Sequence, residues 1–350
     1  MLNIIIGVIV LLLWMIGSTF LNTASKTGGV EQTPITSHCD VINIQTYNNS
    51  LERLKILKKK MSVNKTLEKS FSRIYFNLNN DGLLENMYPS DPKKFQEYLT
   101  DETEKDGIAP ITIDTSKIPV VSKPKPNTKA RYNGLWVHLA EIKLHKYQYD
   151  LLKNKFTLDA GLDDYAYILG KLYLTLGSLT INMSVPPRLI RNGIDHELFG
   201  SPLNAVENYC SPMEIEKKFG SSGNFFDFEF QKDKIYMANP PFDETLMKEM
   251  ALRLVQEDIN CVVVIPVWDS ETQKELGEKD YGMDFEAFRI LKQHAKKHMV
   301  MPKKDCVYYS YYQDRLFPVV STHVLLLGEW GGYDKFITDW KNMSSDVVKR

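Results

Sequence analysis

The uninterrupted apolar run CVVVIPV at residues 261–267 restricts the fold of this chain more than any other feature. A strand with one face in solvent alternates apolar and polar side chains, whereas a run that is apolar throughout is typical of a strand covered on both faces. Strand-like segments alternate with helical ones after Pro187, which favours helices on both sides of a mainly parallel sheet. We therefore expect an α/β fold with a doubly wound sheet.

Shorter patterns predict the other strands and helices. Strands are expected at 196–200 and 234–238, and a late antiparallel pair at 307–312 and 322–327. A helix is expected after Asp243, which is placed to cap it. Apolar residues at helical spacing predict two earlier helices, at 135–155 and 162–180.

Changes in composition divide the chain into five parts. We expect a membrane anchor at 1–25, a stalk with a partly helical region and a Pro/Lys-rich linker at 26–133, a helical domain at 134–185, the α/β core at 186–335 and a C-terminal tail at 336–350. The linker is assigned from the four prolines between 110 and 126, because proline-rich segments make extended spacers.

The anchor is expected because residues 4–21 are almost entirely apolar and no charged side chain precedes Lys26. About 18 residues at 1.5 Å each reach roughly 27 Å, close to the hydrocarbon thickness of a bilayer. This predicts a single-pass membrane protein, and Lys26 after the span favours the body of the chain facing the cytosol. A cleaved signal peptide is the alternative.

The charge balance limits how the chain can bind nucleic acid. Lys and Arg number 43 and Asp and Glu number 44, for a net charge of −1. Non-specific coating of nucleic acid by a polycation is thereby excluded, and contacts must come from local basic patches. The stretch 291–304 contains Lys292, Lys296 and Lys297 and no acidic residue. We expect this stretch to border an RNA-binding mouth; a solvated helix face is the alternative.

Cysteine and histidine spacing predicts no metal site. The four cysteines are widely scattered and form no CxxC pair, which fits reduced thiols, although two disulfides remain open. His294 and His298 are four residues apart and are expected on one helix, but no third ligand lies near them in the sequence.

The tetrapeptide Asn239-Pro240-Pro241-Phe242 follows a predicted strand and precedes a helix, the position at which open α/β sheets bind ligands. An exocyclic adenine amine is a poor nucleophile because its lone pair is delocalised into the ring. An Asn oxygen and a Pro carbonyl can accept its two N–H bonds and aim the lone pair at an electrophilic methyl group. The prolines stiffen the loop, and Phe242 is expected to stack on the base. The alternative is a strand-to-helix turn with a Pro-Pro stop.

A second loop has the composition of a cofactor site. Gly200 ends the strand expected at 196–200, and Ser201, Pro202 and Asn204 follow it; small residues let a cofactor approach the backbone. Asp227 lies among four phenylalanines and is a candidate partner for a cofactor ribose or amino group; a strand edge is the alternative.

Four segments together resemble a known family: ELFGSPLNAVENYCS, FGSSGNFFDFEF, ANPPFDETLMKEM and VVVIPVW. They are similar, in the same order, to the phosphorylated-CTD-interacting-factor family of cap-specific adenosine N6-methyltransferases. The resemblance covers about residues 180–330, and the helices from about 134 correspond to that family's helical domain. It implies a class I, Rossmann-like methyltransferase sheet. No WW domain is expected at the N-terminus, so recruitment to a phosphorylated polymerase tail is not implied.

The resemblance also implies the cofactor, the substrate and the roles of the residues. S-adenosylmethionine is the expected methyl donor, and capped RNA with a 2′-O-methylated first adenosine is the expected substrate. Residues 239–242 are expected to bind and orient the adenine, and Gly200, Ser201, Pro202, Asn204 and Asp227 to bind the cofactor. Pro266 and Trp268 are expected to border the substrate.

Two other functions stay open. The same loop serves any adenine that is flipped out of a stack, so DNA or internal RNA is an alternative substrate. The other alternative is a membrane-tethered binding or structural protein that keeps the fold without catalysis. The sequence indicates no oligomeric state.

Overall fold

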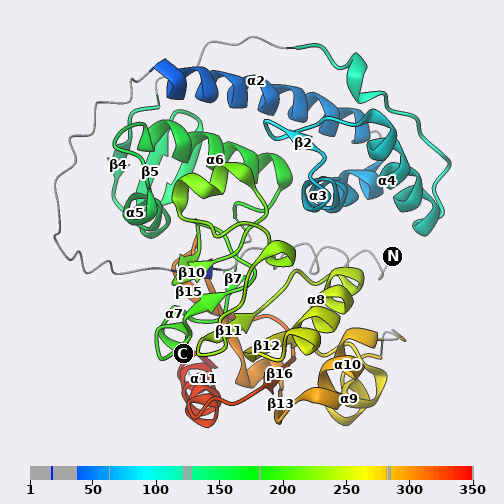
Figure 1. The fold of residues 1–350 in the computed structure, drawn as a ribbon, viewed down its shortest axis with the longest axis vertical. Coiled ribbons are helices and arrows are strands. Elements are labelled where there is room, and N and C mark those ends of the chain that lie inside the picture. The colour runs from blue at the N-terminus through cyan, green and yellow to red at the C-terminus, as the bar shows by residue number, and fades with distance from the viewer. Residues whose placement is uncertain are drawn as a thin grey trace. The chain divides into compact units, whose positions relative to one another are not determined.

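The computed structural model describes residues 17–18, 38–62, 64–120, 126, 128–180, 183–280, 282 and 285–348 (Figure 1). It forms two compact units. Of the described residues, those within 38–179 and 213–218 form the helical unit, and those within 17–18, 180–212 and 219–348 form the sheet unit. Helices from residue 38 onwards belong to the same unit as the segment expected to form a helical domain at 134–185.

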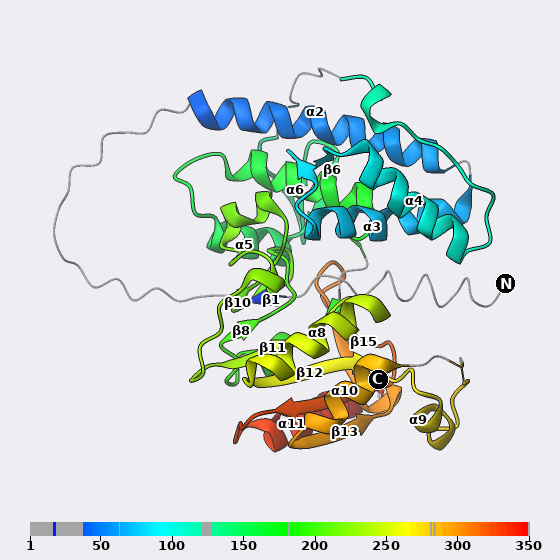
Figure 2. The same ribbon diagram turned by 45° about the vertical axis from the view of Figure 1, so that its right-hand side comes forward.

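The helical unit contains five α-helices in its described part: α2 (His38–Met61), α3 (Lys65–Asn80), α4 (Pro92–Lys105), α5 (Lys146–Lys155) and α6 (Leu162–Leu176). It also contains the hairpin β2 (Leu84–Glu85) and β3 (Tyr88–Pro89), the antiparallel strands β4 (Arg131–Asn133), β5 (Trp136–Leu139) and β6 (Ile142–His145), and the short helices η1 (Thr115–Lys117) and η2 (Glu214–Phe219). Figures 1 and 2 show α2 lying along α6 and α3.

Helix α2 packs through one apolar stripe. Leu51, Leu54 and Leu57 are fully buried, and residues three apart lie on one face of a helix. The helix begins at His38, inside the segment expected to be a stalk. Its polar N-terminal sequence resembles a linker, but contacts with the rest of the unit stabilise the helix.

The expected helix at 135–155 is wrong in its first half. Residues 136–145 form the hairpin of β5 and β6, whose turn places Ala140 at φ 50°. Val137 and Leu139 are buried on one strand and Ile142 and Leu144 on the other, which is the alternation of half-buried strands. The second half is helix α5, and the helix expected at 162–180 is α6, which ends at Gly177 with φ 80°.

The sheet unit has a six-stranded sheet in the order β10 (Asn208–Tyr209), β8 (His196–Glu197), β11 (Ile235–Ala238), β12 (Asn260–Pro266), β16 (Thr322–Leu327) and β13 (Lys297–Met301). Smaller strands are β1 (Gly17–Ser18) with β9 (Ala205–Val206), and β7 (Met183–Ser184) with β14 (Val307–Ser310) and β15 (Arg315–Pro318). Its helices are α7 (Pro187–Ile190), α8 (Glu244–Glu257), α9 (Ser270–Glu275), α10 (Glu286–His294), α11 (Tyr333–Val348), η3 (Phe225–Asp227) and η4 (Lys303–Asp305).

The expected mixed α/β fold is confirmed, with β12 covered on both faces. Cys261, Val263 and Ile265 face a core built with α8 and α10. Val262 and Val264 face the core on the other side, which contains residues of α7 and α11. Strands β10, β8, β11 and β12 are parallel, and β16 runs antiparallel to both β12 and β13.

The expected late antiparallel pair is wrong. The strand at 322–327 does not pair with the strand at 307–310; it is inserted between β12 and β13, and β14 pairs instead with β15. All six residues of β16 are buried, so this strand needs neighbours on both sides. The expected C-terminal tail is also structural, because Phe336, Ile337 and Trp340 of α11 are buried in the core.

The expected location in a membrane is contradicted. In the part of the chain that the structure describes, no helix is both long and apolar enough to cross a bilayer. Of the expected span 4–21, only Gly17–Ser18 is described, and it pairs as strand β1 with Ala205–Val206; the rest lies outside the described residues. A spanning helix satisfies its backbone groups internally, whereas these two residues pair with another strand.

A buried histidine makes the sheet unit sensitive to acid. His196 on β8 is 7% exposed, and burial lowers its pKa to about 3. The unfolded chain, with a His pKa near 6.5, binds the proton more readily. Stability is therefore complete above about pH 6.5 and falls progressively as the pH drops towards 3, with about 2 kcal/mol lost at pH 5 from this group. Urea unfolding at pH 7, 6 and 5 measures the slope.

The control is His196→Gln, which removes the titrating ring. We expect its free energy of unfolding to fall less steeply between pH 7 and 5 than that of the unmodified chain. Equal slopes would contradict a neutral buried His196.

Candidate functional site

Three neighbouring parallel strands end at one edge of the sheet. Strand β8 ends at Glu197, β11 at Ala238 and β12 at Pro266. In register, Met237 lies beside Glu197 and Ala238 beside Val263. The loops that follow, 200–204, 239–242 and 267–269, therefore leave from the carboxyl edge, where open α/β sheets bind ligands. The structure brings together the two loops that the sequence singled out.

Asn239 is the first residue after β11, and its amide group is buried without a partner. The residue is 2% exposed, and neither Oδ1 nor Nδ2 has a hydrogen-bond partner among the described residues. An unsatisfied buried amide costs about 1–3 kcal/mol, and nearly all such groups in native proteins are bonded to protein, water or ligand. This amide is therefore available to bind a polar ligand.

The loop after Asn239 is held by the start of helix α8. The Asp243 carboxylate accepts a hydrogen bond from the Leu246 N–H at 3.0 Å, as the N-cap of α8. The Asp243 N–H donates to the Pro241 carbonyl at 2.8 Å. Pro240 is buried and Pro241 half-buried, so the loop has few conformations open to it.

Phe242 lies in the core and not on the surface of the loop. It is 1% exposed, and its ring meets that of Trp268 edge-to-face at 5.7 Å between centroids. Phe242 precedes the N-cap of α8, a position at which apolar side chains commonly pack against the first turn. Met247 of that turn belongs to the same core. The ring was expected to stack on a base, but core side chains cover it in this position.

The loop expected to bind a cofactor is compact. The Gly200 N–H donates to the Cys210 carbonyl at 2.8 Å, and Ser201 Oγ accepts from the Leu203 N–H at 3.1 Å. Ser201, Pro202 and Asn204 are buried, and Gly200 is half-buried.

Sequence reasoning missed Glu197, a fully buried carboxylate at the end of β8. An acidic residue inside the strand predicted at 196–200 was the available signal, because acidic residues are depleted in strand interiors.

Asp227 has an exposed side chain at the end of η3. The segment around it is tied to α8 by Arg253, whose guanidinium donates to the carbonyls of Phe225 and, at 2.5 Å, Phe228. The same guanidinium lies over the ring of Phe230, at 4.8 Å from its centroid. Arg253 thus couples the segment that carries Asp227 to the helix that follows Asn239, a link that sequence spacing did not reveal.

The structure does not bring Lys296 and Lys297 to this edge, whereas the Lys292 ammonium lies over the ring of Phe288, which stacks on His323. Lys297 is on β13, where it pairs with Leu326, and Leu326 pairs with Val262 near the start of β12. Val262 is four residues, or about 13 Å along the strand, from Pro266 at the carboxyl edge. Helix α10, which carries Lys292, ends at His294, and β13 begins at Lys297 near the amino edge.

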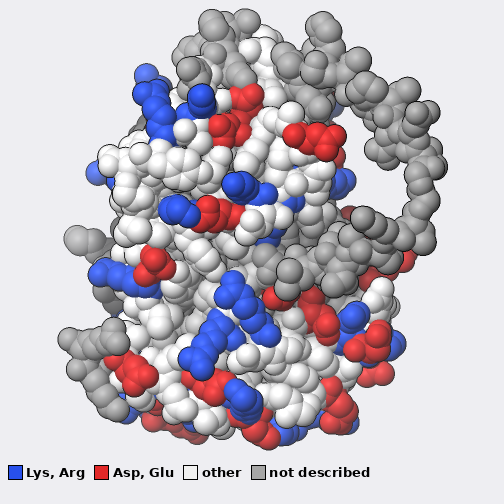
Figure 3. Space-filling view, turned by 90° about the vertical axis from the view of Figure 1, so that its left-hand side faces the viewer, with Lys and Arg blue, Asp and Glu red and all other residues white. Residues whose placement is uncertain are grey.

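On the face shown in Figure 3, several Lys and Arg side chains lie next to one another in the lower half, but basic side chains do not cover the whole face. Acidic and basic groups are interspersed there, as the net charge of −1 suggests. Lys297 pairs with Asp334 at 2.5 Å, so part of its charge is neutralised within the sheet unit. RNA contacts at the carboxyl edge must therefore use residues other than Lys296 and Lys297.

A chain of three hydrogen-bonded side chains begins beside Trp268. Asp269 Oδ2 lies 2.6 Å from His323 Nε2, and His323 Nδ1 lies 3.0 Å from His298 Nε2. Burial lowers the pKa of His298 to about 4 and also lowers that of His323, although Asp269 opposes the latter. Both rings are therefore neutral at pH 7.

Neither cysteines nor histidines assemble a metal site in the described residues, where no group of three potential ligands occurs. His294 and His298 were expected on one helix, but the structure separates them, because His298 is on β13. Cys210, Cys261 and Cys306 are buried free thiols, and burial raises the pKa of Cys306 to about 12. Reactive thiolates are therefore not expected at these positions.

Comparison with models of protein families matches residues 151–308 to the family described as Phosphorylated CTD interacting factor 1 WW domain. The match covers less than half of the 350 residues. It includes the three loops at the carboxyl edge and supports a relationship between this chain and that family. No curated protein matches the chain.

Proposed function

We propose that this chain transfers a methyl group from S-adenosylmethionine to N6 of adenosine in RNA, most specifically the 2′-O-methylated adenosine next to the cap. The observation that carries the proposal is the buried amide of Asn239, which has no partner within the described chain and lies at the carboxyl edge of parallel strands. The family match gives this geometry a chemical context.

The Asn239 side chain has the groups that an adenine amine requires. Its Oδ1 accepts one N–H of the amine and holds the lone pair towards the methyl group. The Pro241 carbonyl already accepts the Asp243 N–H, which leaves the Pro240 carbonyl as the second acceptor. Because both acceptors are in a loop fixed by the cap of α8, little reorganisation is needed during transfer.

The residues of the neighbouring loop fit the proposed cofactor. Gly200 has no side chain to block a close approach to the backbone, and Ser201 and Asn204 supply buried polar groups beside it. S-adenosylmethionine supplies an electrophilic methyl group when bound. Asp227, on the segment that Arg253 holds, is the proposed partner for a hydroxyl or amino group of the cofactor.

The strand order supports the same class of enzyme. Four parallel strands are followed by a reversed strand, β16, that separates β12 from β13. A parallel sheet with one reversed strand at this place is the arrangement that class I methyltransferases use. A protein that binds no ligand at this edge gains nothing from a buried amide without a partner in the described residues, since the group destabilises the empty site.

The test is mass spectrometry after incubation of the purified chain with isotopically labelled S-adenosylmethionine. The substrates are capped RNA with 2′-O-methyladenosine first, the same RNA uncapped, a guanosine-initial capped RNA and an adenine-containing DNA strand. We expect label at N6 of the capped adenosine alone. Label on DNA or uncapped RNA would show that the enzyme methylates adenine without a cap. No label on any substrate would refute methyl transfer.

A further inference from the structure

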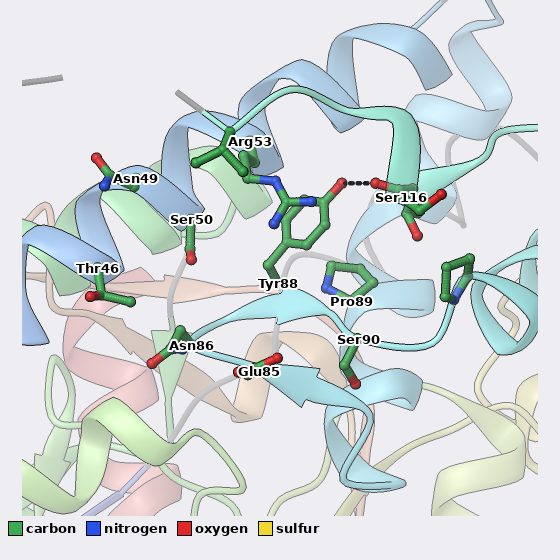
Figure 4. Close-up of a pocket in the computed structure, with 13 residues that line it drawn as sticks. Thr46, Asn49, Ser50, Arg53, Glu85, Asn86, Tyr88, Pro89, Ser90 and Ser116 are labelled. Carbon is green, nitrogen blue, oxygen red and sulfur yellow. Dashed lines mark hydrogen bonds between the residues drawn. The ribbon is translucent and has the colours of Figure 1, made fainter. Parts of the chain in front are cut away.

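The helical unit holds a polar pocket of about 490 Å³ (Figure 4). It is lined on one side by α2 and on the other by the hairpin of β2 and β3 and by η1. Its volume lies within the range of small-molecule sites, about 300–1,000 Å³. All its residues belong to the helical unit, and neither the proposed reaction nor the family resemblance uses them.

Helix α2 presents a polar stripe to this pocket. Thr46, Asn49, Ser50 and Arg53 are spaced i, i+3, i+4 and i+7, so they share one face of the helix. Such a stripe normally faces solvent, but here it faces a hairpin, and Ser50 is only 8% exposed. Burial of polar groups is unfavourable unless they are hydrogen-bonded, so core packing does not explain this face.

Arg53 is a cation without a counter-ion inside the pocket. Its guanidinium lies over the ring of Tyr88, 3.8 Å from the centroid, and its Nε is buried with no hydrogen-bond partner in the described part of the chain. No acidic side chain within the described residues pairs with it. Glu85, the only acid among the described residues that line the pocket, is exposed on the opposite strand (Figure 4).

Tyr88 fixes Arg53 without neutralising it. The ring is buried, and its hydroxyl donates to the Thr115 carbonyl at 3.0 Å. Burial raises the pKa of Tyr88 to about 12, so the ring is neutral at physiological pH. The guanidinium is therefore held against the ring and bonded to the Tyr88 side chain, while its buried Nε–H, without a partner in the described residues, can donate to an oxyanion.

We propose that this pocket is a second binding site, which takes the phosphate group of a nucleotide-sized ligand on Arg53, with Asn49 and Ser50 as additional donors. An arginine that is stacked on a ring and surrounded by hydroxyl and amide groups binds an anionic phosphate better than it binds a neutral or cationic ligand. The same chemistry serves inorganic phosphate and a phosphate ester, and the size of the pocket favours the ester.

Calorimetry with the full chain tests the site with three probes: inorganic phosphate, uridine monophosphate and uridine. A pyrimidine avoids the adenine chemistry of Asn239. We expect both phosphate-bearing probes to bind, the nucleotide more tightly, and uridine to give no heat. Arg53→Gln should weaken nucleotide binding by about tenfold or more, because a charge-assisted pair is lost.

Lys60→Gln is the matched control, since it removes the same charge from an exposed position on the same helix; its affinity should be unchanged. Asn49→Asp gives a second test that should also weaken binding about tenfold, in case Arg53→Gln fails to fold. Asn239→Ala should bind the nucleotide normally, so failure here is separable from failure of methyl transfer. No binding of either phosphate probe, or equal losses in Lys60→Gln and Arg53→Gln, would overturn the proposal.

Discussion

Asn239→Ala should lower the rate of methyl transfer to adenosine by about 10²–10³-fold, because one preorganised acceptor for the amine is lost from the transition state. Affinity for S-adenosylmethionine should change little, since the amide is proposed to bind the base. Single-turnover kinetics with capped RNA measure the rate, and calorimetry measures cofactor binding. Near-normal turnover in this variant would refute the assignment of this loop as the catalytic site.

Stability distinguishes this role from a structural one. The amide is buried without a described partner, so its removal should leave the free energy of unfolding unchanged or slightly higher. A structural asparagine would instead destabilise the chain when removed. Asn239→Asp keeps one acceptor but adds negative charge, and we expect activity between that of the unmodified chain and Asn239→Ala.

Phe242→Ala should destabilise the sheet unit by about 3–5 kcal/mol, the usual cost of removing a buried aromatic ring. The ring is 1% exposed and packs edge-to-face against Trp268, so its removal leaves a cavity beneath the 239–242 loop. Urea unfolding measures the loss.

Two further variants make the Phe242 test specific. Phe242→Leu keeps most of the apolar volume and should cost about 1 kcal/mol. Leu252→Ala, at a residue of α8 that is 51% exposed, should change stability by no more than about 0.5 kcal/mol. If Phe242→Leu folds normally but loses RNA binding, the ring contacts the base after all.

Local patterns were enough to predict the loop at Asn239 and the elements on either side of it in the candidate site. The strand β12, the helix α8 with its Asp243 cap and the position of Asn239 at a strand end all depend on a few adjacent residues. Periodicity, caps and proline act over one or two turns, so they can be recognised without knowing the partners. The order of the strands then brings loops 200–204 and 239–242 to the same edge.

Pairing between distant segments could not be predicted in this way. The strand at 322–327 was expected beside 307–312, but it lies between β12 and β13. The lysines of 291–304 were expected at the mouth of the site, but the register of β13 places Lys297 at the opposite edge. Register depends on which neighbour buries each face, and that choice is made by the whole sheet.

The sequence by itself determined that the chain has a strand covered on both faces and a rigid Asn-Pro-Pro-Phe loop behind a parallel strand, because these follow from the chemistry of adjacent side chains. Only the tertiary structure decided which side chains of that loop join the core and which remain available to a ligand. Asn239 is left as a buried donor and acceptor without a described partner, whereas Phe242, three residues later, joins the core. The polar stripe of α2 likewise lines a pocket only because the hairpin of β2 and β3, which is distant from it in sequence, covers it. Burial of this kind depends on tertiary contacts, which local sequence patterns do not reveal.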